Sequence, residues 1–214
     1  MKKLILLLFP AILVLSCKTE TPKTTTDLEQ IQECYLKYKE GILQGNGIAV
    51  MAQVSQKSLD YYSEMLRYAK GADSTAIADS GLTEKFTILQ TRQRIESDVL
   101  VKMSDESYFI YVVEQGMIGK ASVENVEIGD INIEGSSAKG DILIEGRKQE
   151  QFKFQFIKQE EGWKIDLLNL MVISSDGLKI EIERSPLSEQ EYIMKVLEVI
   201  TRKKRKDDLW KPRL

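Results

Sequence analysis

The chain has two cysteines and no histidine among its 214 residues. Without histidine the sequence cannot form a Ser-His-Asp or Cys-His catalytic site, or a His-Glu-x-x-His zinc motif. Cys17 ends an apolar run in the stretch LVLSCKTE, and Cys34 stands three residues after Ile31 and four before Tyr38. This helical spacing predicts that Cys34 is a small buried packing group, with a reactive thiol as the alternative.

The first residues have the pattern of a secretory signal, with two lysines before an apolar core at residues 4–15. That core is shorter than the about 20 apolar residues that a membrane-spanning helix needs. The run VLSC at residues 14–17 resembles the lipobox of bacterial lipoprotein precursors, with valine where leucine is commonest. The resemblance implies that a signal peptide of residues 1–16 is removed and that Cys17 carries acyl chains on its sulfur and nitrogen. An ordinary signal peptide that ends near a cysteine is the alternative.

Lipid on Cys17 determines where the protein resides. Anchoring is stable when more than one acyl chain enters the bilayer, so we expect a membrane-bound protein of the cell envelope. The expected site is the outer membrane of a Gram-negative bacterium, on its periplasmic or surface side. Residues 17–26 form the lipidated cysteine and a polar tether, whose nine residues after Cys17 span about 15 to 18 Å. Cys34 alone then forms no internal disulfide, and we expect no metal or cofactor.

The composition is that of a folded domain with one core, since 43% of the residues are hydrophobic. Removal of the signal peptide leaves 28 basic and 33 acidic residues, a net charge of -5. A mildly acidic domain is a poor candidate for nucleic-acid binding, and we expect no such partner.

Helices are predicted first, from apolar residues at spacings of three and four and from caps such as Thr26 with Glu29. The segment 104–116 has the aromatic content of a strand but the caps of a helix, and we predict a helix. Ser188 and Glu191 form a second capping box. The predicted helices cover residues 26–45, 55–71, 83–95, 104–116 and 188–201.

Strands are predicted from about residue 121, where the apolar period changes to two. Alternating residues give strands at 126–133, 142–144, 152–156 and 163–167, with a break near Gly129. Short turns between them indicate antiparallel pairing, and helices before a meander indicate an α+β fold with the helices on one sheet face. Residues 172–185 are ambiguous. The cluster RKKRK at 202–206 is predicted to be a solvated tail, with lipid headgroup contact as the alternative.

The stretch EGWKIDLLNL at 161–170, preceded by FKFQFIKQEEG, resembles the nuclear transport factor 2-like, or cystatin-like, superfamily over residues 27–170. The resemblance implies a curved antiparallel sheet that wraps around helices as a cone. It places the domain at residues 27–185, followed by a C-terminal helix and basic tail at 186–214. Members of the superfamily include ketosteroid isomerases, dehydratases, and scaffold and transport proteins, so the fold alone does not decide the function.

An isomerase-like site in such a cone would use Asp166 as the base and a tyrosine as the hydrogen-bond donor. Alternation argues against it, since Asp166 should lie on the side opposite Trp163 and Ile165, toward water or a partner. Lys153 or Lys164 is the expected cross-strand partner of its carboxylate. The candidate tyrosines are Tyr35, Tyr61, Tyr62 and Tyr108.

Aromatic and aliphatic residues could instead line a pocket for an apolar ligand, although at sheet period they are typical of a core. Trp210 and the final helix could plug the open end of the cone. The candidate ligand-binding residues are Phe152, Phe154, Phe156, Trp163, Ile165 and Tyr62.

The sequence thus predicts a lipid-anchored, non-catalytic module that binds a protein partner or an apolar small molecule, with no catalytic residues. An isomerase or lyase with its active site in the cone is the alternative. A third hypothesis is a structural envelope protein that forms a homodimer through the outer face of its sheet.

Overall fold

The computed structural model describes residues 25–214. The signal peptide, the lipid on Cys17 and most of the tether are predictions that lie outside the described residues. Within residues 25–214, no helix is both long and apolar enough to cross a bilayer.

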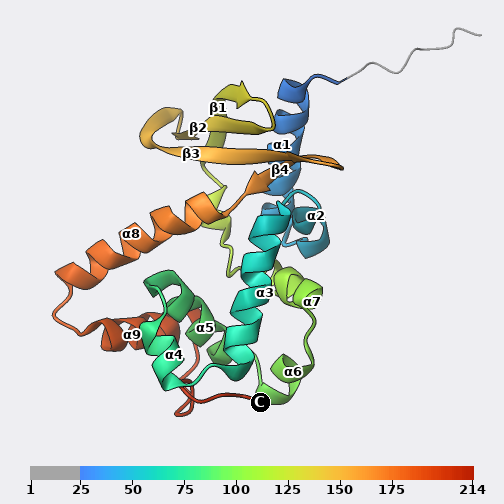
Figure 1. The fold of residues 1–214 in the computed structure, drawn as a ribbon. Helices are drawn as coiled ribbons and strands as arrows, with labels where there is room; N and C mark the ends of the chain where they lie inside the picture. The colour runs from blue at the N-terminus through green and yellow to red at the C-terminus, as the bar shows by residue number, and fades with distance from the viewer. Residues whose placement is uncertain (1–24) are drawn as a thin grey trace, which may run out of the picture.

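The chain has an α+β fold, in which most helices precede one antiparallel sheet (Figure 1). The sheet and α1 form one end of the molecule, with α2 and the start of α3 beside them, and α8 extends from the sheet (Figure 1). The helices α4, α5, α6 and α9 gather at the opposite end with the C-terminus (Figure 1). The helices are α1 (Asp27–Gln44), α2 (Gly47–Met51), α3 (Gln56–Gly71), α4 (Ser74–Asp79), α5 (Leu82–Arg94), α6 (Ser97–Lys102), α7 (Asp105–Glu114), the 3-10 helix η1 (Lys120–Ser122), α8 (Leu168–Arg184) and α9 (Glu189–Thr201). The strands are β1 (Val126–Glu134), β2 (Ser137–Ile144), β3 (Arg147–Gln159) and β4 (Gly162–Asp166).

Side-chain caps start four of the five predicted helices, whereas α5 begins after Gly81 with no side-chain cap. Thr26 and Glu29 form a complete capping box at α1, and the second predicted box starts α9. Ser55 accepts a hydrogen bond from the Ser58 backbone at the start of α3. Ser104 does the same for α7, so the prediction of a helix at 104–116 is confirmed. Each such cap satisfies a backbone N–H that has no partner within the helix.

The sheet has the predicted order β1-β2-β3-β4, with every pair antiparallel. The predicted break in β1 is a register shift between Ile128 and Ile131. On the inner face Tyr35 of α1 packs on Phe154, with ring centroids 4.8 Å apart, and donates a hydrogen bond to the Val126 carbonyl at 2.8 Å. The side chains of α1 therefore fill the concave face of the sheet.

Four α-helices within the described residues were not predicted, and the longest of them is α8. It includes nearly all of the ambiguous segment 172–185, and none of its side chains is buried. The fourth strand ends at Asp166 instead of continuing to residue 167. There the Asp166 carboxylate accepts a hydrogen bond from the backbone N–H of Leu168 at 3.0 Å and so begins the helix. The other unpredicted α-helices are short: α2 has five residues, and α4 and α6 have six each.

The basic cluster at residues 202–206 exposes the side chains of residues 202–205 to solvent, but its backbone is attached to the fold. The Gln93 amide donates to the Lys204 carbonyl at 3.0 Å and accepts from the Lys206 N–H at 3.1 Å. Leu209 is buried in the common core. Residues 186–214 thus complete the core.

Arg92 of α5 joins the end of α3 to the C-terminal tail, and its side chain is fully buried. Within residues 25–214 its guanidinium donates to four backbone carbonyls and to no carboxylate. Three belong to the end of α3 and its cap, and the fourth is that of Leu209 in the tail, at 2.9 Å. Burial lowers the pKa of Arg92 to about 10, with the nearby Arg213 acting in the same direction. The α3 acceptors are Ala69 at 2.8 Å, Tyr68 at 3.1 Å and Ala72 at 2.6 Å.

Arg92→Met should destabilise the protein strongly, because it leaves buried carbonyls without donors, at about 1–3 kcal/mol for each unsatisfied group. We expect the free energy of unfolding to fall by at least about 3 kcal/mol, measured by urea denaturation. Arg184→Met, at an exposed position of α8, is the control and should change stability by less than about 0.5 kcal/mol. Equal effects of the two substitutions would contradict the role of Arg92.

Candidate functional site

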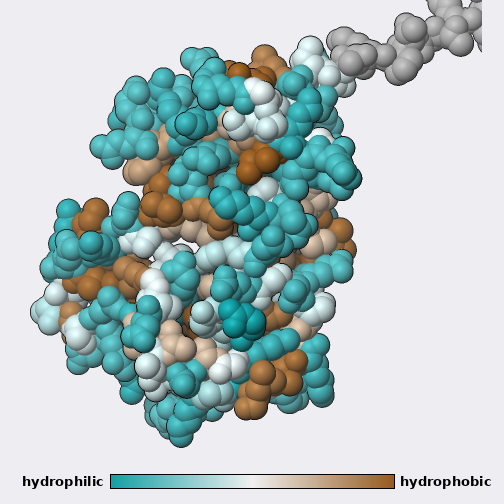
Figure 2. Space-filling model, viewed as in Figure 1, coloured by the Kyte–Doolittle hydropathy of each residue, from teal (hydrophilic) through white to brown (hydrophobic). Residues whose placement is uncertain are grey.

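A cavity of about 260 Å³ lies between α3, α5, the segment after α7 and the start of α8. In Figure 2 the molecule is hollowed between the part that carries the sheet and the helices beyond it, with hydrophobic residues beside the hollow. Its wall is mostly apolar, as in pockets that bind small molecules. The apolar lining residues are Phe86, Met117, Ile118, Leu167, Leu170 and Met171.

Several polar side chains of the cavity lack hydrogen-bond partners among the described residues, including Thr83, whose hydroxyl oxygen is buried. Tyr38, Tyr62 and Gln90 line the cavity and are 1%, 7% and 7% exposed. Within residues 25–214, no hydrogen bond joins their side-chain polar atoms to another residue. Three other tyrosines, Tyr35, Tyr61 and Tyr108, do form hydrogen bonds through their hydroxyls, and of these only Tyr61 lines the cavity. Buried polar groups almost always have a partner, in the protein or in solvent, so Tyr38, Tyr62 and Gln90 must find theirs inside the cavity.

The helices hold these side chains by aromatic packing. Tyr62 meets Phe109 of α7 edge to face, with ring centroids 5.1 Å apart, and meets Tyr61 in the same way at 5.5 Å. Gln90 follows Phe86 by four residues and therefore lies on the same face of α5. The orientation of the Tyr62 ring is thus set by its neighbours rather than by a bond to its hydroxyl.

The cavity carries no ionised side chain among its described lining residues. Burial raises the pKa of the Tyr38 hydroxyl, with nearby Tyr35 acting in the same direction. The pKa of Tyr62 is raised by burial as well, and next by Tyr38 and Tyr108. Both hydroxyls therefore stay protonated and neutral. The cavity offers apolar contact and neutral hydrogen bonds, without a carboxylate to act as a base.

Asp166 lies beside the cavity, but it is buried and the prediction that it faces water is wrong. Its side chain accepts a hydrogen bond from the Ser58 hydroxyl at 3.1 Å, and that hydroxyl accepts one from the Leu167 N–H at 2.8 Å. The first turn of α3 covers this end of β4, so the outward side of the strand is not solvent. The nearest cation is Lys57, at 3.8 Å.

Neither lysine predicted to pair with Asp166 does so. Lys153 pairs with Asp141, and Lys164 donates to the Ala52 carbonyl at 2.7 Å. Asp166 is therefore a structural group that joins β4, α3 and the start of α8, and through α8 it positions one wall of the cavity.

Of the six predicted ligand-binding residues, Tyr62 alone lines the cavity. Phe152 is half-buried at the edge of the core. The sequence analysis did not identify Tyr38 and Gln90 as lining residues. Gln90 could have been found, because it is a polar residue on the buried face of the helix predicted at 83–95. The other four lie in the core on the sheet: Phe154, Phe156, Trp163 and Ile165.

Cys34 is a buried packing group, as the sequence predicts. Its thiol is 4% exposed and contacts the Gln53 carbonyl at 3.5 Å. Burial raises its pKa to about 11, so the nucleophilic thiolate is scarce at neutral pH. Among the described residues, no three side chains of the metal-ligating types come together.

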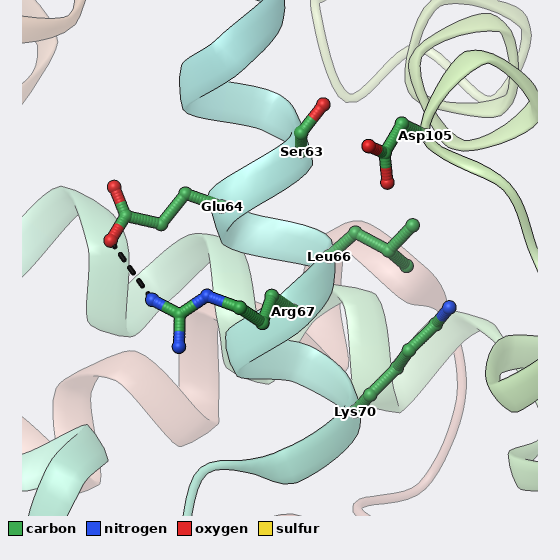
Figure 3. A pocket seen from close by; sticks show the side chains of 6 residues that line it. All are labelled: Ser63, Glu64, Leu66, Arg67, Lys70 and Asp105. Atoms are coloured by element: carbon green, nitrogen blue, oxygen red, sulfur yellow. Dashed lines mark hydrogen bonds and ion pairs between the residues drawn. The ribbon is translucent and has the colours of Figure 1, made fainter.

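A second hollow follows the exposed side of α3 (Figure 3). Arg67 there pairs with Glu64 at 3.1 Å, and the Lys70 ammonium donates to the Met103 carbonyl at 2.8 Å. Asp105 faces α3 from the start of α7 (Figure 3). Exposed pairs of this kind are common on solvated surfaces and contribute about 0–1 kcal/mol. This groove is a weaker candidate than the cavity because its charged groups are already paired or hydrated.

No family model, curated protein or solved structure matches this chain.

Asp166→Ala should destabilise the junction between β4 and α8, because the Ser58 hydroxyl and the Leu168 N–H lose their buried acceptor. We expect a loss of about 1–3 kcal/mol in the free energy of unfolding and faster hydrogen exchange in the first turn of α8. Asp176→Ala, at an exposed position of the same helix, is the matched control. Unchanged exchange at the start of α8 would contradict the positioning role.

Proposed function

We propose that this protein is a lipid-anchored protein of the cell envelope whose domain binds a small apolar molecule in the cavity. The observation that carries the proposal is the combination of an apolar wall with Tyr38, Tyr62 and Gln90, three buried polar side chains without partners among the described residues. Ligand pockets commonly have this design, in which apolar surface supplies affinity and a few polar groups set orientation.

The size of the cavity suits a compact ligand. A volume of about 260 Å³ is about nine times the roughly 30 Å³ that one molecule occupies in liquid water. This is close to the lower end of the about 300–1,000 Å³ found for ligand pockets. A molecule of one or two rings fits this space.

Binding is favoured over isomerase or lyase chemistry by the lining residues. An isomerase-like site needs an inward-facing carboxylate near a tyrosine hydroxyl. The described lining includes three tyrosines and no carboxylate, and Asp166 is occupied by Ser58 and the start of α8.

The lipid anchor agrees with the position of the described ends. Residue 25 lies near the sheet, at the end of the molecule opposite the C-terminus (Figure 1). A short tether before it would hold the sheet end close to the membrane, with the helical end farther away. The cavity, between the two ends, then stays accessible.

Growth with a labelled fatty acid tests the anchor. We expect label in the parent protein and none in Cys17→Ala, because the resemblance places both acylated atoms on that residue. Cys34→Ala is the matched control and should keep the label, since that thiol is buried. Label that persists in Cys17→Ala would contradict the lipid anchor.

Naphthalene binding tests the cavity, with the lipidated protein held in nanodiscs of neutral lipid. The ¹³C-methyl resonances of Met117 and Met171, which line the cavity, should shift on addition of naphthalene. Ser174→Phe fills the cavity from α8 and should weaken binding at least about tenfold, whereas Asp176→Phe places the same ring on the opposite face of that helix. The absence of shifts in the parent protein, or an equal effect of the two variants, would contradict the proposal.

A further inference from the structure

The polar groups of the cavity are richer in donors than in acceptors. The Tyr38 and Tyr62 hydroxyls each donate one hydrogen bond and can also accept, and the Gln90 amide presents two N–H donors and one carbonyl oxygen. We call these three side chains the donor cluster, since they hold four donor hydrogens and three acceptor oxygens. Buried donors without partners are rarer in proteins than acceptors with a spare lone pair. A ligand that brings an acceptor therefore satisfies donors that the protein leaves unpaired.

The donor cluster keeps its protons under any physiological condition. Desolvation raises the pKa of both tyrosines, and the neighbouring hydroxyls of Tyr61 and Tyr108 raise that of Tyr62 further. The Tyr61 and Tyr108 hydroxyls already have partners in the protein, Glu84 at 3.5 Å and Thr91 at 2.6 Å. Tyr62 therefore has no need to share its proton with either neighbour.

The lining also excludes a charged ligand. No lysine, arginine, aspartate or glutamate is among the described residues that form the wall. An ion that leaves water for an apolar site without a partner of opposite charge pays a desolvation penalty that neutral hydrogen bonds do not offset. A neutral group with a strong acceptor meets no such penalty.

We propose that the cavity binds a neutral, mostly apolar molecule that carries a carbonyl oxygen, and that this oxygen accepts hydrogen bonds from the donor cluster. The inference rests on the proposed function and adds the chemical class of the ligand. A ketone, aldehyde, ester or amide on a ring-sized apolar body satisfies it.

The test compares three probes of similar shape on the lipidated protein in neutral nanodiscs. Acetophenone carries a carbonyl, isopropylbenzene replaces it with hydrocarbon, and benzoate replaces its methyl group with an anionic oxygen. Binding is followed by the methyl resonances of Met117 and Met171. Those of Met65 and Met194, which do not line the cavity, report whether each variant keeps its fold.

Conservative variants identify the donors. Tyr62→Phe removes one hydroxyl and keeps the ring, and we expect acetophenone to bind about fivefold more weakly, the size of one net hydrogen bond. Isopropylbenzene should change by less than twofold, since it has no acceptor to lose. Gln90→Leu should act in the same direction, and Tyr38→Phe replaces either variant if its fold is disturbed.

The outcomes separate this inference from the function on which it rests. If the variants weaken both neutral probes equally, or neither, the donor cluster does not recognise a carbonyl, although resonance shifts still support a ligand cavity. If benzoate binds the parent protein as tightly as acetophenone, the preference for neutral ligands is wrong. If no probe shifts Met117 or Met171, the inference and the proposed function both fail.

Discussion

The buried guanidinium of Arg92 is the interaction on which the helical part of this molecule depends. An unpaired charge inside a protein is destabilising by several kcal/mol, and a single counterion often offsets it poorly. Arg92 instead meets the carbonyls at the end of α3, which carry the partial negative charge of the helix dipole, and one carbonyl of the tail. Four hydrogen bonds from one side chain therefore satisfy the end of a helix and attach the C-terminal tail to it.

A second junction, at Asp166, controls the other side of the cavity. There a carboxylate accepts hydrogen bonds from the Ser58 hydroxyl and the Leu168 N–H, so that β4, α3 and α8 meet at one buried group. Arg92 fixes α5 against α3, and Asp166 fixes the start of α8 against α3. The space between these fixed elements is the cavity, and its shape follows from the two junctions rather than from its own lining.

The sequence predicted local features well and long-range polar contacts poorly. The capping boxes at Thr26 and Ser188 and the period of two in the strands depend on neighbours a few residues away, and both are present in the structure. The buried state of Asp166 depends on Ser58, which is 108 positions away, so alternation along β4 placed it wrongly in water. Arg92 donates a hydrogen bond to Leu209, which is 117 positions away. In the sequence Arg92 is only a basic residue in the last turn of a helix, which gives no sign that it is buried. The cavity was not predicted for the same reason. Tyr38, Tyr62 and Gln90 belong to three different helices, and no local sequence pattern specifies how those helices are arranged.

The composition of the cavity is itself an argument for a ligand. Protein interiors are close-packed, and buried polar groups almost always have hydrogen-bond partners. Here an apolar wall surrounds Tyr38, Tyr62 and Gln90, whose side chains form no hydrogen bond with another described residue. The exposed residues Ser122 and Ser174 also line this space, so it opens to solvent and a small molecule can enter it. An apolar space that is open at its rim and has unpaired polar groups inside suits a small molecule that brings both apolar surface and a hydrogen-bonding atom.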